Sequence, residues 1–403
     1  MRRRLLLGSM VTLLVAGVVW LPVAGAAAPT SGYIVVLKGS VGSPGAVAAE
    51  QAQARDLTVG HVYRHALKGY SAVMTAADAQ ALRADPRVAS VTSDRPVHLD
   101  QQVLPTGIDR VDGELSSTVS GDGAGSVDVD VAVIDTGIDP THPDLNVAGG
   151  VNCAPGQGFD DRNGHGSHVA GTIAAKDNDL GVVGVAPGAR LWAVRVLNPG
   201  GLGSFASVIC GVDWVTARSD VIEVANMSLG GSGTEPSGRG CATGDAFHDA
   251  VCSSVAAGVT YTVAAGNEAD DAANHVPAAY DEVITVSALA DFDGKPGGLG
   301  SPTCRADEDD TLANFSNFGA DVDLIAPGVC ILSTYKRSGY ATFSGTSMAS
   351  PHAGGAAALY LASHPSATPA QVKRALQAAG NLNWNNADDP DGIKEPLVNV
   401  DAF

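Results

Sequence analysis

The sequence predicts an α/β protein in which helices sandwich a mostly parallel β-sheet, preceded by a small α+β domain. From about residue 125 onward, short and nearly continuous apolar runs alternate with helical segments, a pattern typical of parallel strands buried on both faces. Between residues 33 and 94, strand and helix patterns alternate in β-α-β-α-β order, which favours a separate small domain. With 45% hydrophobic and 17% charged residues among 403, the chain can bury a large core.

Residues 1–28 are predicted to be a secretory signal peptide. A basic start, Met1–Arg4, precedes a long apolar stretch and small residues at Ala24–Ala28, as in signal peptides with an A-x-A cleavage site. The apolar stretch is long enough that an uncleaved anchor is the alternative. We expect the segment to be removed and the protein to be secreted, with no stable membrane association.

The small α+β domain is expected over residues 32–99. Its apolar alternation and its Ala-rich and Gln-rich stretches predict three strand regions and two helices. The strands are expected at 33–38, within 61–75 and at 88–94, and the helices at 43–56 and 76–84.

The large α/β domain is expected over residues 101–403. Six apolar runs predict its strands, at 129–134, 191–197, 221–226, 261–265, 283–288 and 322–326. Helices are expected between them, at 165–176, 203–218, 243–257 and 347–363. Ligands bind beyond the carboxyl ends of strands in such sheets. Asp135, one residue past the run at 129–134, and Asn267, two residues past the run at 261–265, are therefore candidate site residues.

Three glycine-containing motifs carry an aspartate, a histidine and a serine in that chain order. They are V-A-V-I-D-T-G at 131–137, N-G-H-G-S-H-V-A-G-T at 163–172 and G-T-S-M-A-S-P-H at 345–352. A serine hydroxyl becomes a strong nucleophile when an imidazole takes its proton and a carboxylate orients that imidazole. Asp135, His165 and Ser347 are therefore predicted to form a catalytic triad.

Each motif also has a simpler interpretation. Asp135 could cap a turn, and Ser347 could merely begin a helix. His165 and His168 could bind a metal together, but two histidines without a third ligand at suitable spacing make an incomplete zinc site. The three motifs jointly favour catalysis, with no catalytic metal.

The motifs and their order resemble those of the subtilisin-like serine proteases. The resemblance implies that Asn267 in T-V-A-A-G-N-E supplies a side-chain donor to the oxyanion. It also implies that the small domain is an inhibitory propeptide. Two extended segments are expected to bind the substrate backbone, namely Gly201, Leu202 and Gly203 on one side and Ser228, Leu229 and Gly230 on the other. The specificity pocket would lie between 228–230 and 265–267, with its floor near Asn274–Pro277.

The same resemblance implies a structural calcium site. Gln102, Asp144 and Asn178 would provide side-chain oxygens, and Leu180 and Val182 would provide carbonyl oxygens, all of the hard type that Ca²⁺ prefers. Because Gln102 would then lie near the mature N-terminus, the propeptide is expected to end around Leu99–Gln101. A second acidic region, 291–294 with 306–311, is a weaker candidate for calcium.

Charge and cysteine content restrict the partners and the compartment. A net charge of −19 argues against nucleic acid as a partner, because phosphate binding requires basic surfaces. The six cysteines form no C-x-x-C pair, so disulfides are favoured over a metal site in an exported protein. Proximity in the sequence suggests the pairs Cys241–Cys252, Cys304–Cys330 and Cys153–Cys210.

The predicted function is a secreted serine endopeptidase made as a self-cleaving zymogen. Its expected partners are protein or peptide substrates and its own propeptide as intramolecular inhibitor, and the mature protein is expected to be a monomer. The alternative is a catalytically silent relative whose propeptide stays bound and forms a binding surface. The intact Asp135, His165, Ser347 and Asn267 argue against that alternative.

Overall fold

The computed structural model describes residues 30–55, 57–94, 102–237 and 241–403. It divides into two compact units, one within the first 98 residues and the other in the remainder of the chain. The expected signal peptide and the expected propeptide end at Leu99–Gln101 lie outside the described residues. Among the described helices, none is long and apolar enough to cross a membrane.

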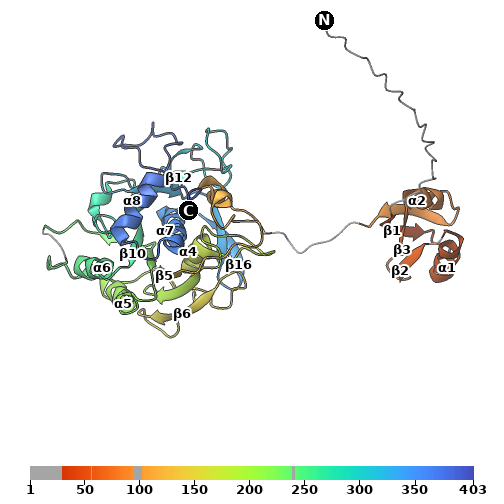
Figure 1. Ribbon diagram of the computed structural model, residues 1–403, viewed down its shortest axis with the longest axis horizontal. Helices are drawn as coiled ribbons and strands as arrows, with labels where there is room; N and C mark the ends of the chain where they lie inside the picture. The colour runs from red at the N-terminus through yellow and green to blue at the C-terminus, as the bar shows by residue number, and fades with distance from the viewer. Residues whose placement is uncertain (1–29, 56, 95–101, 238–240) are drawn as a thin grey trace, which may run out of the picture. The chain divides into compact units, whose positions relative to one another are not determined.

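The first unit is a four-stranded antiparallel sheet with two helices (Figure 1). Its strand order is β2-β3-β1-β4. The apolar side chains of β1 point into the core, where Val35 and Leu37 are buried. The elements are β1 Thr30–Leu37, α1 Pro44–Arg55, β2 Thr58–Tyr63, β3 Gly69–Thr75, α2 Ala76–Arg83 and β4 Val88–Ser93. This confirms the predicted small α+β fold.

The second unit contains an eight-stranded, mostly parallel sheet. Its order is β13-β12-β10-β8-β5-β7-β6, with β14 also pairing with β12 and β13 running antiparallel. The strands are β5 Asp130–Asp135, β6 Val147–Asn152, β7 Arg190–Arg195, β8 Val224–Met227, β10 Thr260–Ala264, β12 Ile284–Ala290, β13 Thr311–Leu312 and β14 Leu324–Pro327. The predicted parallel sheet is therefore confirmed.

Helices cover both faces of this sheet. Successive side chains of a strand point to opposite faces, and since both sets are apolar here, both faces have to be buried. On β5, Val131 and Val133 pack in the core that includes α4 and α7, whereas Ala132 and Ile134 pack against α5 and α6. The latter two helices lie side by side (Figure 1). The long helices are α4 His165–Ala174, α5 Phe205–Thr216, α6 Ala246–Ala256, α7 Thr346–Ser363 and α8 Pro369–Ala379.

The remaining elements are short, and several were not predicted. They are α3 Thr106–Arg110, η1 Gly113–Leu115, η2 Ala272–Asn274, the pair β9 Gly231–Ser232 and β11 His275–Val276, and the hairpin of β15 Ile331–Tyr335 and β16 Gly339–Phe343. The sequence pattern also missed β6, whose Val-Ala-Gly-Gly-Val-Asn sequence is only partly buried and lacks a continuous apolar run. All three suggested disulfides are present in the structure.

Candidate active site

Asp135 is the last residue of β5, at the carboxyl end of a central strand of the sheet. Its side chain is fully buried, and its Oδ1 accepts a hydrogen bond from the Thr136 amide at 2.6 Å. Parallel neighbours β7 and β8 hold the strand on both sides. The carboxylate is therefore fixed in position by rigid structure.

His165 is the first residue of α4 and contacts this carboxylate directly. Its Nδ1 lies 2.8 Å from Oδ1 and 2.9 Å from Oδ2 of Asp135. Burial lowers the pKa of His165, but the charge and hydrogen bond of Asp135 outweigh that effect, so the pKa lies above its usual range. Since Nδ1 faces the carboxylate, Nε2 remains for proton transfer, and a quarter of the side chain is exposed.

The two glycines beside His165 are required by packing. Gly164 has a φ of 113°, a conformation that favours glycine, and a Cβ there would lie 1.9 Å from the Tyr335 ring. A Cβ on Gly166 would lie 2.1 Å from the carbonyl oxygen of Gly137. Gly166 thus lets α4 approach the end of β5, so that His165 reaches Asp135, and Gly164 leaves room for the Tyr335 ring.

Ser347 lies in the first turn of α7, directly after Gly345 and Thr346. Its Oγ donates a hydrogen bond to the Ser228 carbonyl oxygen at 3.2 Å, and the Ser228 hydroxyl donates to the Ser347 carbonyl oxygen at 2.8 Å. The predicted nucleophile is thereby tied to the predicted substrate segment. Among the described residues Ser347 Oγ makes no hydrogen bond to His165, and catalytic hydrogen bonds are often long or misaligned until the substrate is bound.

Asn267 follows β10 and faces the start of α7. Its Oδ1 accepts hydrogen bonds from the Thr346 amide at 2.8 Å and from the Thr346 hydroxyl at 3.1 Å. Because Oδ1 is occupied in this way, the Nδ2 group is left as a donor for another partner. Asn267 is exposed, so that partner can come from the solvent side.

All six predicted substrate-binding residues line one cavity of about 650 Å³, and His165 lines it too. Leu197, Phe205 and Val208 make one wall of the cavity apolar. The cavity lining includes neither 265–267 nor the expected pocket floor at Asn274–Pro277. Instead, β11 in that floor pairs with β9, which directly follows Gly230.

Comparison with known proteins identifies the family of this chain. Residues 126–392 match the Subtilase family. The chain belongs to the subtilases. It is 38% identical to subtilisin DY of Bacillus licheniformis over 305 residues, covering 75% of this chain and 98% of that protein. Subtilisin E of Bacillus subtilis (strain 168) is also 38% identical, over 326 residues that cover 80% and 76% of the two proteins.

The small domain and the fold match as well. Residues 32–100 match the Peptidase inhibitor I9 family. The crystal structure of a cold-adapted subtilisin-like serine proteinase aligns with a TM-score of 0.58 and 32% identity, covering 74% of this chain and 98% of that one. The protein is therefore a subtilisin-family serine endopeptidase with an I9 propeptide domain, as predicted.

Asp161 is a residue of this subtilase site that sequence reasoning missed. It is buried; its Oδ1 accepts the Gly164 amide at 2.8 Å and the Thr136 hydroxyl at 2.9 Å. Its Oδ2 accepts the Ser167 amide at 2.9 Å. These bonds fix the start of α4, and the Asp161 charge also helps to raise the pKa of His165. An aspartate shortly before a predicted helix start was the available signal.

The predicted calcium ligands lie close together around the loop that follows α4. Asp144 is buried, and its Oδ1 accepts a bond from Asn178 Nδ2 at 3.0 Å, while its Oδ2 accepts the Val182 amide at 3.1 Å. The Leu180 amide donates to Asn178 Oδ1 at 2.6 Å. Burial raises the pKa of Asp144 more than its hydrogen bonds lower it, so a nearby cation would stabilise its charged form.

Gln102 completes this group of oxygen-bearing residues. Its Nε2 lies 2.7 Å from the Lys176 carbonyl oxygen and 3.3 Å from that of Val182. A 180° turn of the amide would bring Oε1 among these carbonyl oxygens instead, since the two ends of the group have the same shape. The donor set therefore fits Ca²⁺. The Lys176 carbonyl oxygen, which was not among the predicted ligands, lies in the same group.

The second acidic region is partly neutralised by a buried arginine. Arg110 Nε lies 2.7 Å from Asp291 Oδ2, and Arg110 Nη2 lies 2.7 Å from Asp310 Oδ1. Among the described residues, three groups of acidic and histidine side chains are close enough to hold an ion. They are Asp291, Asp293 and Asp309; Asp389, Asp391 and Glu395; and Glu235, His248 and Glu282.

Proposed function

We propose that this subtilase is a secreted, self-maturing endopeptidase that uses Asp135, His165 and Ser347 as its catalytic triad. The observation that carries the proposal is the two-oxygen contact of Asp135 with His165 at the edge of the 650 Å³ cavity. Ser347 is joined to the same cavity through its bonds with Ser228. These contacts support a triad beside a cavity that a peptide can enter.

In the proposed mechanism, Ser347 Oγ attacks the carbonyl carbon of the scissile bond while His165 Nε2 takes its proton. Asp135 holds His165 in the tautomer that bears its proton on Nδ1 and stabilises the charged ring. His165 then gives the proton to the leaving amine, and an acyl-enzyme remains on Ser347. A water molecule, activated by the same imidazole, releases the second product.

The oxyanion of the tetrahedral intermediate is proposed to bind the Ser347 amide and Asn267 Nδ2. The α7 N-terminus adds the positive end of its dipole. Thr346 holds Asn267 through its Oδ1, which supports an amide preoriented for donation. Loss of this donor in a subtilisin costs about 10²–10³ in rate, and we expect a similar cost for Asn267→Ala.

The substrate is proposed to be a protein or peptide held in extended form by Gly201–Gly203 and Ser228–Gly230. The segment 32–99 is proposed to act as an intramolecular inhibitor until the chain is cut near Leu99–Gln101, after removal of a signal peptide at 1–28. The mature enzyme, from about residue 101, would act outside the cell as a monomer.

Self-maturation is tested by refolding the purified full chain in the absence of other proteases. The wild type should lose its first ~100 residues, whereas Ser347→Ala should keep them. Ser363→Ala serves as the matched control, because Ser363 is an exposed serine on the same helix. The catalytically silent alternative would be supported if wild type and Ser347→Ala were processed equally. It would also be supported if a correctly folded wild type hydrolysed no peptide.

We also propose that Gln102, Asp144, Asn178, Leu180 and Val182 bind a structural Ca²⁺. Chelation should lower the melting temperature by several degrees, because an ion that binds only the native state stabilises it. Asp144→Asn should remove this calcium response. Asp179→Asn, an exposed carboxylate in the same loop, should keep it. If the melting temperature of the wild type changed with neither calcium nor chelator, the assignment would be refuted.

A further inference from the structure

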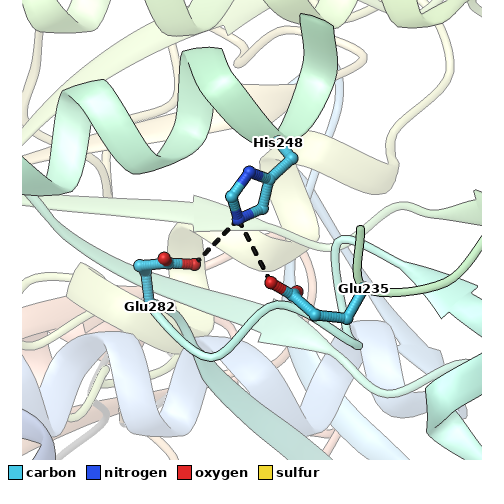
Figure 2. Close-up of side chains that lie close together, drawn as sticks. All are labelled: Glu235, His248 and Glu282. Carbon is cyan, nitrogen blue, oxygen red and sulfur yellow. Dashed lines mark hydrogen bonds and ion pairs between the residues drawn. The ribbon is translucent and has the colours of Figure 1, made fainter. Parts of the chain in front are cut away.

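A histidine and two glutamates from three separate segments meet on the side of the catalytic unit that carries α6. Figure 2 shows His248 Nε2 facing Glu235 and Glu282, at 3.3 Å from Glu235 Oε1 and 3.2 Å from Glu282 Oε2. The His248 side chain is only 1% exposed. The Glu235 Oε2 atom is buried as well and has no hydrogen-bond partner among the described residues.

The other ring nitrogen of His248 determines which tautomer is present. Its Nδ1 lies 3.3 Å from Thr243 Oγ1. Thr243 donates its single hydroxyl proton to Asp249 Oδ1 at 2.8 Å, and Thr243 Oγ1 accepts the Asp245 amide. Thr243 therefore has no proton to offer His248, so His248 Nδ1 must be the donor.

This tautomer leaves the lone pair of a neutral His248 Nε2 pointing at two carboxylates. Three electron-rich atoms at this spacing repel one another unless a cation lies between them. A proton on Nε2 could fill that role, but charge-assisted hydrogen bonds of this type are usually about 2.7–2.9 Å long. Two ligands bound tetrahedrally at about 2.0–2.1 Å lie roughly 3.3 Å apart. The observed distances agree with the second arrangement.

We propose that Glu235, His248 and Glu282 bind a divalent transition-metal ion of the Zn²⁺ type. Imidazole nitrogen combined with carboxylate oxygen suits Zn²⁺, whereas Ca²⁺ prefers ligand sets made of oxygen alone. Three protein ligands leave one position of a tetrahedron for water. The bond from His248 Nδ1 to Thr243, with Asp249 behind it, provides the outer support that metal-binding histidines usually have.

The place of the three ligands suggests what the ion would do. Glu235 lies three residues after β9, which itself continues from the substrate segment Ser228–Gly230. Glu282 lies two residues before β12, and His248 is in the first turn of α6. An ion bound here would join these segments and stabilise the flank of the substrate cleft, at a distance from the reacting groups.

Zinc binding to the full chain carrying Ser347→Ala, which prevents autolysis, tests the proposal. The metal-free protein is titrated with Zn²⁺ by calorimetry, and with Co²⁺ by visible absorption, which reports tetrahedral coordination. Glu282→Gln changes one ligand atom and His248→Gln removes the imidazole. Asp220→Asn, an exposed carboxylate in the turn after α5, is the matched control. Circular dichroism of the metal-free forms checks that each variant is folded.

The wild type and Asp220→Asn should bind Zn²⁺ with equal affinity, show the tetrahedral Co²⁺ band and melt at a higher temperature with zinc. Both ligand variants should bind Zn²⁺ at least about tenfold more weakly and lose the band. If His248→Gln does not fold, Glu282→Gln decides alone.

Three results would overturn the proposal. They are equal Zn²⁺ affinity in wild type and Glu282→Gln, absence of the tetrahedral Co²⁺ band in the wild type, and displacement of Zn²⁺ by an equal concentration of Ca²⁺. Because the readout is binding, the result is independent of the proposed proteolysis.

Discussion

His165 and His168 lie three residues apart on α4, yet the fold gives them opposite properties. His165 is partly exposed, contacts the buried Asp135 carboxylate and has a raised pKa. His168 is fully buried, and burial lowers its pKa to about 3. The first can therefore accept a proton near neutral pH, whereas the second stays neutral.

Their hydrogen-bond partners explain this difference. His168 Nε2 lies 2.9 Å from the Ile331 carbonyl oxygen and 3.1 Å from that of Ala341, on the two strands of the β15–β16 hairpin. Its ring stacks on Phe343 at a centroid distance of 4.7 Å. His168 thus fastens a hairpin to α4, while His165 faces the cleft. In an H-x-x-H motif, the packed neighbours of each ring decide which histidine does chemistry.

The largest expected effect comes from removing the charge of Asp135, which contacts His165 but not His168. Asp135→Asn should lower kcat by about 10⁴, because an amide no longer enforces the productive tautomer of His165 or stabilises its charged form. The rate is measured on a peptide substrate after the propeptide has been removed by a metalloprotease, which is then inhibited. Asp128→Asn, which is 89% exposed near the start of the same strand, is the control. A loss below tenfold would mean that Asp135 is not the partner of a catalytic base.

Substitution of the other histidine, His168→Leu, should lower the stability and leave kcat nearly unchanged. His168→Leu deprives two strand carbonyls of their donor, so the free energy of unfolding should fall by about 1–3 kcal/mol. Urea unfolding in the Ser347→Ala background measures this loss, and kcat of the folded active enzyme should stay near wild type. His364→Leu, an exposed position after α7, should change stability by less than about 0.5 kcal/mol. A large loss of kcat in a stable His168→Leu enzyme would contradict the division of roles.

The sequence was sufficient to predict the elements that carry strong local signals. The strands β5 and β10 are nearly continuous buried runs, and their ends place Asp135 and Asn267 at one edge of the sheet. The neighbours that require glycine at 164 and 166 are Tyr335 and Gly137. Such neighbours are far apart in the sequence and cannot be seen in a local pattern.

Contacts that no local sequence pattern encodes account for what was missed. Thr243, the partner that sets the His248 tautomer, lies in a loop, and Glu235 and Glu282 carry no motif. Asp161 looks like an ordinary turn residue until the fold brings it beside Thr136 and the start of α4. The Lys176 carbonyl beside Gln102 is a backbone group, so its position does not depend on side-chain identity. Residue type alone therefore could not reveal them.

The pH dependence of activity and of stability should distinguish the two histidines again. Because neutral His165 is the proposed base, kcat/KM should fall about tenfold per pH unit below the His165 pKa, which the Asp135 carboxylate holds above its usual range. His168 affects stability instead. Its folded pKa of about 3 is below its unfolded value, so the unfolded chain takes up a proton first as the pH falls. Stability should then be lost from about pH 6.5 downward, by about 1.4 kcal/mol per unit.

His168→Leu distinguishes these two acid effects. The variant should keep the wild-type pH dependence of kcat/KM, measured above pH 5 where the enzyme is still folded. Its unfolding free energy should decline less steeply than that of wild type between about pH 6.5 and 4, because one buried neutral imidazole has been removed. His352, whose pKa burial lowers to about 4, should maintain part of the decline in both proteins. Suppose that His168→Leu shifted the pH dependence of kcat/KM and left the pH dependence of the unfolding free energy unchanged. The assignments of His165 and His168 would then have to be exchanged.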